Sequence, residues 1–361
     1  MPEPGDEELY IGLEHLDSGS LRVTRWGSEV ELVGQKLVMQ KGDILFGRRN
    51  TYLRRAAIAP HDGIFSAHGM IFRPNTAVID PDYFPFFISS DYFMDAAIRI
   101  SVGSLSPTVN WKTLKELEFF LPDLNQQRHT AELLSTANET KEAYQDLLIK
   151  SDELVKSQFI ELFSDIPRDE YQKLSAVCKI ITDGTHQPPI FVDKGIPFLL
   201  VSNITGNVIT YETPKYISQE TYDALMKRTP IEIGDILLST VGSYGHPAIV
   251  KENRPFSFQR HIAYLKPDAS KIDSVFLHTA ILSDDVQKQI DDLVLGVAQK
   301  TLNLSAIRGI QIPVPSIDRQ QSFNLFVEQL DKSKFNLQIA IYRAVWRLQN
   351  KQQKLACCDL F

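Results

Sequence analysis

The segment Lys41-Gly42-Asp43-Ile44-Leu45 occurs a second time, in altered form, as Ile233-Gly234-Asp235-Ile236-Leu237. The second copy lies 192 positions after the first. Two further blocks repeat at a spacing of 193 positions, namely GSLSPTVN (103–110) as GVAQKTLN (296–303) and LPDLNQQ (121–127) as VPSIDRQ (314–320). One register therefore holds across three separated blocks. This predicts an internal two-fold repeat, with two similar domains that face two similar targets.

Length and composition are those of an ordinary soluble globular protein. The chain has 361 residues, of which 43% are hydrophobic and 23% charged, and this length suggests two or three domains. No apolar run approaches the roughly 18–20 residues that cross a bilayer. Residues 1–8 are acidic and lack the apolar core of a signal peptide. We therefore expect a cytoplasmic protein without a membrane partner.

The charge and the cysteines narrow the function further. The net charge of −7 argues against a protein that coats DNA by bulk charge, although it leaves room for local basic loops. The three cysteines are Cys178, Cys357 and Cys358, and no pair has the spacing of metal ligands. We expect reduced thiols and no metal site.

Each copy has the same order of predicted elements. Short strand-like runs at 43–46 and 235–238 end in glycine-containing loops. Apolar strands bounded by proline are predicted at 117–122 and 310–315. Helices with alternating three- and four-residue spacing follow, which is typical of a coiled-coil seam. The seam positions are Ala137, Tyr144, Leu148, Ser151, Val155 and Leu162 in the first helix, and Leu330, Leu337, Ile341, Ala344, Leu348 and Leu355 in the second.

The two seams occupy equivalent positions, so we expect the helices to pair with each other. Each would have about 35 residues and a length of about 50 Å. Packing of each helix on its own domain is the alternative. An antiparallel pair would set the two domains at opposite ends of a rod, with residues 166–170 as the joint between the copies. The predicted fold class is α+β, with two mixed domains separated by two long helices, and the predicted boundaries are 1–123, 124–165, 166–316 and 317–361.

The loop after the first glycine–aspartate strand is unusually basic. Residues 48–55 (RRNTYLRR) contain four arginines with an asparagine and a tyrosine between them. Arginine reads guanine edges and grips phosphate, and asparagine reads adenine. A solvated surface loop or a protein-binding patch is the alternative. The counterpart at 239–246 (STVGSYGH) differs completely while its flanks match, as expected if each domain reads a different sequence from a shared scaffold.

Two more loops could carry recognition. Residues 182–189 (TDGTHQPP) form a polar loop whose single histidine is too little for a metal site, and a simple turn is the alternative. Residues 256–261 (FSFQRH) place Gln, Arg and His beside aromatic residues, which suits base edges or the rim of a strand.

Catalysis has weak support in the sequence. There is no phosphate-binding loop and no Gly-x-Ser-x-Gly elbow. Asp123 followed by Glu139 and Lys141 resembles a metal-dependent nuclease pattern, which needs these groups together around Mg²⁺. Glu139 and Lys141 fall within the predicted helix, and the second copy keeps neither carboxylate. We treat this match as accidental and predict no catalytic residue.

The repeat, the TDGTH loop, the paired Gly-Asp-Ile-Leu strands and the Pro-x-x-x-x-Gln helix entries resemble the specificity subunit of type I restriction–modification systems. The resemblance covers nearly the whole chain. It implies two target-recognition domains, each reading one half of a split site in double-stranded DNA, and an antiparallel coiled coil that fixes the unread gap. It also implies no catalytic activity and no cofactor of its own. Two methylation subunits that use S-adenosylmethionine, and ATP-dependent restriction and translocase subunits, would be the partners.

Carried over by position, the resemblance gives a set of DNA-binding candidates: Arg48, Arg49, Asn50, Tyr52, Arg54, Arg55, His68, Lys112, Thr185, His186, Ser243, Tyr244, His246, Gln259, Arg260 and Lys300. The first copy has only eight residues before Leu9, whereas the second has 29 residues before Leu200, counted from Tyr171. The first domain should therefore lack a counterpart of the Asp183–His186 loop, either as a shortened variant or because an N-terminal piece is missing. Two alternatives stay open, the specificity chain of a type IIB system and a scaffold that binds proteins but no DNA.

Overall fold

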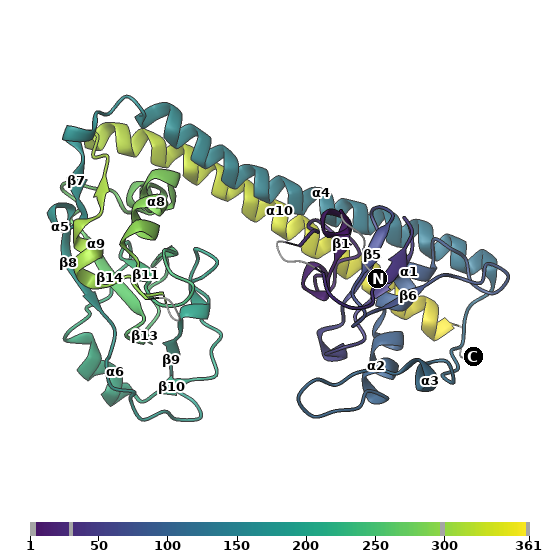
Figure 1. Cartoon of the computed structure of the whole chain (residues 1–361). Helices are drawn as coiled ribbons and strands as arrows, with labels where there is room; N and C mark the ends of the chain where they lie inside the picture. Colours follow the sequence, from purple (N-terminus) through teal and green to yellow (C-terminus); the bar gives the residue numbers. More distant parts are fainter. Residues whose placement is uncertain (1–4, 29–31, 297–299, 359–361) are drawn as a thin grey trace. The chain divides into compact units, whose positions relative to one another are not determined.

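The computed structural model describes residues 5–28, 32–296 and 300–358, with side chains as far as residue 339. The chain divides into two compact units. Unit 1 comprises Met1–Glu142 together with Tyr342–Phe361, and unit 2 comprises Ala143–Ile341. Both units are mixtures of helices and strands, as Figure 1 shows. This confirms the predicted α+β class.

Unit 2 is built around a four-stranded sheet. The strands lie in the order β12 (Pro247–Ile249), β11 (Ile236–Ser239), β14 (Ile262–Pro267) and β8 (Cys178–Asp183), and all neighbours are antiparallel. All four residues of β11 and the first four of β14 are buried, because both strands lie in the middle of the sheet with both faces covered.

Smaller sheets and helices complete unit 2. β9 (Ile196–Leu199) lies between β10 (Tyr216–Ile217) and β13 (Ser257–Phe258), and β7 (Gln172–Lys173) pairs with β15 (Gln311–Ile312). The helices are α5 (Leu174–Val177), α6 (Gln219–Met226), α7 (Ser274–Leu282), α8 (Asp284–Leu293) and α9 (Leu304–Gly309), with 3-10 turns η4 (Arg168–Glu170) and η5 (Val201–Asn203). Side chains of Asp273, Ser283 and Asn303 cap α7, α8 and α9 by accepting backbone N–H bonds, which fixes where these helices begin.

Unit 1 has related elements and one strand fewer in its main sheet. β3 (Ile44–Phe46) lies between β4 (Ala56–Ile58) and β6 (Met70–Phe72), and β5 (Gly63–Phe65) lies between β1 (Tyr10–Ile11) and β2 (Leu37–Met39). The helices are α1 (Phe84–Ser89), α2 (Asp91–Arg99) and α3 (Trp111–Leu114), with 3-10 turns η1 (Asp6–Leu9), η2 (Leu13–His15) and η3 (Thr51–Leu53).

The repeated glycine–aspartate pair makes the same turn in both units. Gly42 and Gly234 have φ angles of 91° and 93°, in the left-handed region that favours glycine. Asp43 and Asp235 follow, both buried, and each carboxylate accepts a 2.7 Å hydrogen bond from the backbone N–H three residues earlier. The motif recurs in the sequence because each strand β3 and β11 begins with this turn.

Two long helices, α4 (Leu124–Phe163) and α10 (Ile317–Cys358), confirm the predicted helical segments. Within unit 2 their side chains meet in a regular order. Asp152 forms an ion pair with Lys334, and the ring centres of Phe159 and Phe323 are 5.6 Å apart. Arg319 forms an ion pair with Asp165, just beyond the end of α4. Residue numbers fall along α10 as they rise along α4, so the two segments run antiparallel, side by side (Figure 1).

The predicted seam is correct for its middle and wrong near the end of α4. The side chains from Ala137 to Val155 at seam positions are half-buried, as are Leu330 and Leu337. Leu162 is 38% exposed, and the neighbouring Phe163 is buried instead. A straight α-helix has 3.6 residues per turn, so its contact face drifts from a strict heptad. The side chains of the remaining predicted seam residues lie outside the described part: Ile341, Ala344, Leu348 and Leu355.

The strand predicted at 117–122 does not form, whereas β15 does form within 310–315. β15 is held by pairing with β7. In the described part of unit 1, no strand pairs with the 117–122 segment. Hydrogen bonding to a neighbouring strand, rather than the apolar pattern alone, decides between strand and extended loop.

Candidate nucleic-acid interface

In unit 2, β8 and β11 end and β14 begins at the same end of the main sheet. We call this end, where the loops emerge, the sheet edge of the interface. Ser239 at the end of β11 lies opposite Ile262 at the start of β14. Asp183 at the end of β8 lies opposite Ala263, the next residue of β14. The three polar loops of the second copy therefore emerge from the same edge, and they carry its predicted contact residues.

Backbone hydrogen bonds join the loop at 182–189 to the loop at 256–261. Thr185 donates its N–H to the carbonyl of Phe258 at 3.3 Å, and Arg260 donates its N–H to the carbonyl of Thr185 at 3.2 Å. A Cβ atom at Gly184 would lie 2.3 Å from the Phe258 oxygen, so only glycine permits this approach. The structure thus brings together four predicted residues: Thr185, His186, Gln259 and Arg260.

Asp183 organises the side chains at this point. Its Oδ1 lies 2.7 Å from Nη2 of Arg228, and its Oδ2 lies 2.9 Å from Nε2 of His186. Arg228 is about half exposed and was missed in the sequence, because it stands 45 residues from Asp183 with no motif around it. Both partners of the carboxylate keep exposed donor groups at the sheet edge.

The third loop, 240–246, packs against the segment around Lys300. Gly242 donates its N–H to the carbonyl of Lys300 at 3.1 Å. The ammonium of Lys300 lies 5.8 Å from the ring centre of Tyr244, within the range of a cation–π contact. The Tyr244 hydroxyl donates to Asp291 Oδ1 at 2.8 Å. Lys300 is exposed and belongs to the same edge as the loop.

His246 lies deeper in this loop. Its Nε2 is 3.1 Å from the Ser243 hydroxyl, and its Nδ1 is 3.3 Å from Asn207 Oδ1. Burial lowers the pKa of His246 below its ordinary value. Burial, followed by the charge of Arg260, lowers the pKa of His261 in the same way. At neutral pH both rings are uncharged, so they offer hydrogen bonds rather than positive charge.

The same scaffold recurs at the corresponding edge of unit 1. Asn50 donates its N–H to Pro107 O at 2.8 Å, and Val109 donates to Arg48 O at 2.9 Å. The equivalent bonds in unit 2 are Gly242 to Lys300 and Leu302 to Thr240, the latter at 2.8 Å. Asn50 and Gly242, which occupy one position of the repeat, both have positive φ angles, 54° and 74°.

The arginine run 48–55 separates into two pairs. Arg49 is exposed at the sheet edge, and half-buried Arg48 lies beside it, with Nη2 3.3 Å from Ala67 O. Arg54 turns to helix α2, where it forms ion pairs with Asp91 and Asp95. Arg55 points inward and donates to Leu13 O at 2.8 Å. Burial lowers the pKa of Arg55.

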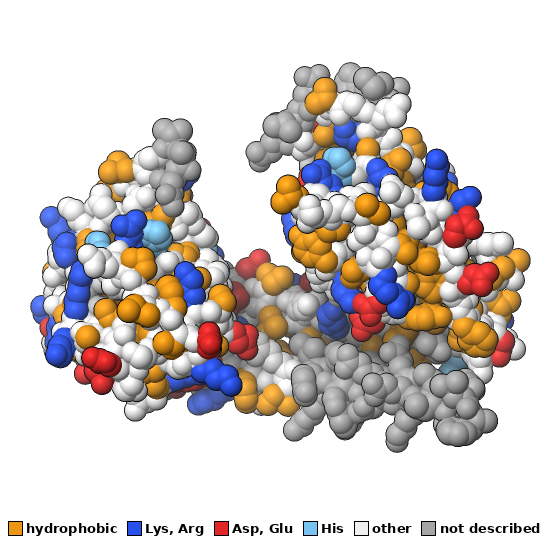
Figure 2. Space-filling view, turned by 90° about the horizontal axis from the view of Figure 1, so that it is seen from below, with side chains coloured by type: hydrophobic (Ala, Val, Ile, Leu, Met, Phe, Trp, Pro, Cys, Tyr) orange, Lys and Arg blue, Asp and Glu red, His pale blue; other side chains and the backbone are white. Residues whose placement is uncertain are grey.

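The remaining candidates of unit 1 are exposed. Tyr52 is 55% exposed in η3, His68 lies in the loop before β6, and Lys112 lies in α3. Leu105, at the tip of the 103–107 loop, is 95% exposed and was not predicted as a contact residue. Figure 2 shows Lys, Arg and His side chains among hydrophobic ones on the faces of both units that are seen from below.

The nuclease-like residues have structural roles. Asp123 Oδ1 accepts the N–H groups of Asn125 and Gln126 at 2.8 and 3.0 Å and so caps α4. Lys141 donates to Gly19 O at 2.9 Å, and Glu139 lies exposed on α4. Within the described residues, no group of three or more His, Cys, Asp or Glu side chains is arranged to hold a metal ion. Nor does any described helix have the length and hydropathy to cross a membrane.

Sequence comparisons point to one family. A family model for the type I restriction modification DNA specificity domain matches residues 170–344. The chain is 30% identical over 172 residues to the type I restriction enzyme EcoBI specificity subunit of Escherichia coli, a match that spans 48% of this chain and 36% of that protein. It is 20% identical over 348 residues to the MjaVIII specificity subunit of Methanocaldococcus jannaschii, which covers 90% of this chain and 81% of the relative.

A solved structure shares the fold. The S subunit of a type I restriction–modification system from M. genitalium aligns with a TM-score of 0.50 at 15% identity, covering 96% of this chain and 88% of that one. The matched specificity domain lies almost wholly within unit 2, whose loops have counterparts in unit 1. Residues 170–344 therefore match the type I restriction modification DNA specificity domain, and over most of its length the chain is similar to type I specificity subunits.

Proposed function

We propose that this chain is the DNA-recognition subunit of a type I restriction–modification complex and that each unit reads one half-site of a split target. One observation carries the proposal. Equivalent backbone hydrogen bonds hold the loops at 48–50 and 240–242, while the side chains presented there differ completely. A constant scaffold with variable side chains suits two domains that read different base sequences.

The chemistry of the two edges fits contact with a duplex. In unit 1, Arg49 and Lys112 are exposed cations, and Arg48 lies half-buried beside Arg49. In unit 2, Lys300 supplies an exposed cation, Arg228 presents N–H donors beside its partner Asp183, and neutral His246 supplies hydrogen bonds. Arginine and lysine contact phosphates and also read guanine edges, and amides, hydroxyls and neutral imidazoles read other base edges.

Catalysis is assigned to partners. We propose that methylation subunits bring S-adenosylmethionine and that restriction subunits bring ATP, with this chain supplying sequence recognition alone. A type IIB assembly would instead pair the chain with one partner that both methylates and cuts, so the identity of the co-purifying subunit separates the two systems.

The deciding experiment is a single-molecule methylation map of the host genome, with and without the gene, and with three point variants. Loss of a modified split motif on deletion is expected. Arg49→Ala should relax one half of the motif and Lys300→Ala the other, while Arg54→Ala, whose cation is held by Asp91 and Asp95, serves as the matched control. An unchanged map on deletion, combined with no sequence preference of the purified complex in gel-shift assays, would replace this proposal by a scaffold that binds only proteins.

A further inference from the structure

β6 of unit 1 is an edge strand, although its counterpart in unit 2 is not. β6 pairs with β3 on one side only, whereas β14 is flanked by β11 and by β8. Met70, Ile71 and Phe72 are only partly buried, whereas Ala263, Tyr264 and Leu265 at the equivalent positions are fully buried. In the described part of unit 1, no strand pairs with the outer edge of β6.

The strand registers establish this equivalence. Ile44 of β3 lies opposite Phe72, and Ile236, 192 positions later, lies opposite Leu265. The open side of Phe72 therefore corresponds to the side of Leu265 on which β8 places Ile181. In unit 2, β8 therefore covers the strand edge that is open in unit 1.

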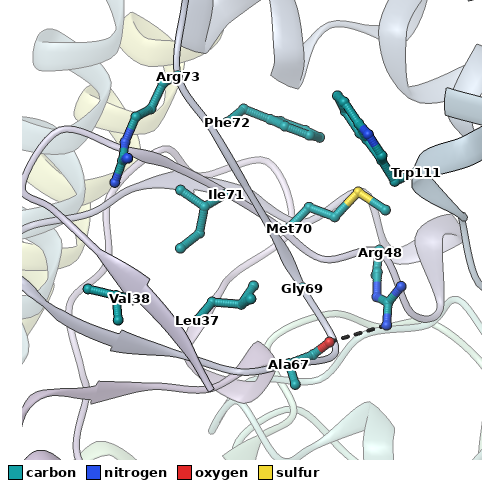
Figure 3. A pocket seen from close by; sticks show the side chains of 10 residues that line it. All are labelled: Leu37, Val38, Arg48, Ala67, Gly69, Met70, Ile71, Phe72, Arg73 and Trp111. Carbon is teal, nitrogen blue, oxygen red and sulfur yellow. Dashed lines mark hydrogen bonds between the residues drawn. The ribbon is translucent and has the colours of Figure 1, made fainter. Parts of the chain in front are cut away.

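A cavity of about 590 Å³ lies beside β6 at this place. Figure 3 shows Phe72 and Trp111 on one side of β6 and Leu37 and Val38 on the other. Trp111 is 57% exposed and Val38 is 76% exposed, so large apolar surface is left in water. Exposed apolar surface next to an unpaired strand edge favours addition of another strand.

The walls of the cavity correspond to the groups that hold β8. In unit 2, α9 packs on β8, and Arg308 of α9 donates to the Ile181 carbonyl at 2.6 Å. The counterpart of α9 is α3, which contributes Trp111 to the cavity. Arg48 also lines the cavity, and its Nε is buried without a hydrogen-bond partner. A peptide backbone in the cavity would offer carbonyl acceptors to this guanidinium.

We propose that the outer edge of β6 and this cavity bind an extended strand of a partner polypeptide that resembles β8. The strand would run antiparallel to β6, with an apolar β-branched residue opposite Phe72, as Ile181 lies opposite Leu265. The inference rests on packing alone and does not require DNA binding. If the proposed function also holds, the strand would bring a loop like that of Asp183–His186 to the end of the unit 1 sheet where the 48–50 loop lies.

The test uses the full chain and a synthetic peptide that copies residues 171–187, with Cys178 replaced by serine. Binding is followed by the fluorescence of Trp111, and a Trp111→Phe variant identifies its signal. A saturable blue shift is expected. A peptide with Ile181→Pro and Thr182→Pro should bind at least tenfold more weakly. Backbone N–H groups of successive residues in a strand point to opposite sides, so one of the two prolines must remove an N–H that would bond to β6.

A matched pair of protein variants locates the site. Val38→Asp places a charge in the cavity and should weaken peptide binding at least tenfold. Val33→Asp changes an equally exposed valine, 81% exposed and outside the cavity lining, and should leave binding unchanged. Absence of binding, equal binding of the proline peptide, or equal effects of the two variants would overturn the proposal. So would a dimer of the chain, seen by analytical ultracentrifugation, that Val38→Asp dissociates and the peptide does not, since a second copy would then occupy the edge.

Discussion

Gln320 anchors the start of α10, and its replacement should destabilise unit 2 by a calculable amount. The side chain is fully buried. Its Oε1 accepts the N–H of Asp273 at 2.8 Å, and its Nε2 donates to the carbonyls of Lys271 and Pro315 at 3.1 and 2.8 Å. The amide therefore joins the entry of α10 to the entry of α7.

Gln320→Ala leaves one N–H and two carbonyls without these partners. Each lost bond contributes about 1 kcal/mol net, and each unsatisfied buried group costs about 1–3 kcal/mol. The expected loss in free energy of unfolding is thus at least about 3 kcal/mol. With a urea m-value of about 2 kcal/mol/M, the midpoint of unit 2 should fall by about 1.5 M.

The assay is urea unfolding followed by two signals. All three tryptophans belong to unit 1, so their fluorescence reports that unit, while circular dichroism reports both. Gln320→Ala should lower the urea midpoint of unit 2, which only circular dichroism reports, and should leave the fluorescence midpoint of unit 1 unchanged. Gln321→Ala, an exposed neighbour, should change neither midpoint. Gln127 makes the equivalent bonds in unit 1, so Gln127→Ala should move the fluorescence transition. A shift for Gln320→Ala no larger than that for Gln321→Ala would refute the anchoring role.

Three further outcomes are expected. Arg49→Ala should reduce the slope of log affinity against log salt by about 0.9 in DNA titrations, whereas Arg54→Ala, already paired, should leave the slope unchanged. Burial raises the pKa of Cys178 to about 12, so in a variant whose other cysteines are serine a thiol reagent at pH 8 should react far more slowly before than after unfolding. Burial is also the largest cause that lowers the pKa of His278 below 6.5, and the unfolded chain therefore binds more protons between the two values. The urea midpoint of unit 2 should consequently fall as the pH drops below 6.5, and His278→Gln should flatten that dependence; a steeper dependence in the variant would contradict the assignment.

The parts of the fold that the sequence predicted are those set by local constraints. Gly42 and Gly234 need a left-handed turn, and the Asp that follows each one accepts a backbone bond three residues back. Such patterns are complete within five residues and so are visible in the sequence. The antiparallel helix pair was also predictable, because a long apolar stripe without glycine or proline requires a partner along its length.

The errors arose where the partner lies far along the chain. The 117–122 segment has a strand-like pattern, but among the described residues of unit 1 no strand takes the part that β7 takes for β15. The four arginines of residues 48–55 were treated as one basic loop because they are close in the sequence. In the structure, Arg54 points to the carboxylates of α2 and Arg55 to the backbone of η2. Arg228 escaped notice because β9, η5, β10 and α6 separate it in the chain from its partner Asp183. Side-chain direction depends on the folded neighbours, which residue type alone does not reveal.

The comparison of the two copies carries more functional information than either copy alone. At positions 48 and 240, 50 and 242, the hydrogen bonds that both units share are made by backbone N–H and C=O groups. Side chains at 48, 49, 240 and 241 can therefore change without loss of the scaffold, whereas the positive φ angle restricts 50 and 242 to residues such as Asn and Gly. Asn50 and Gly242 obey that restriction while their neighbours diverge. Divergence limited to the positions that the backbone leaves free is what selection for two different targets on one scaffold would produce.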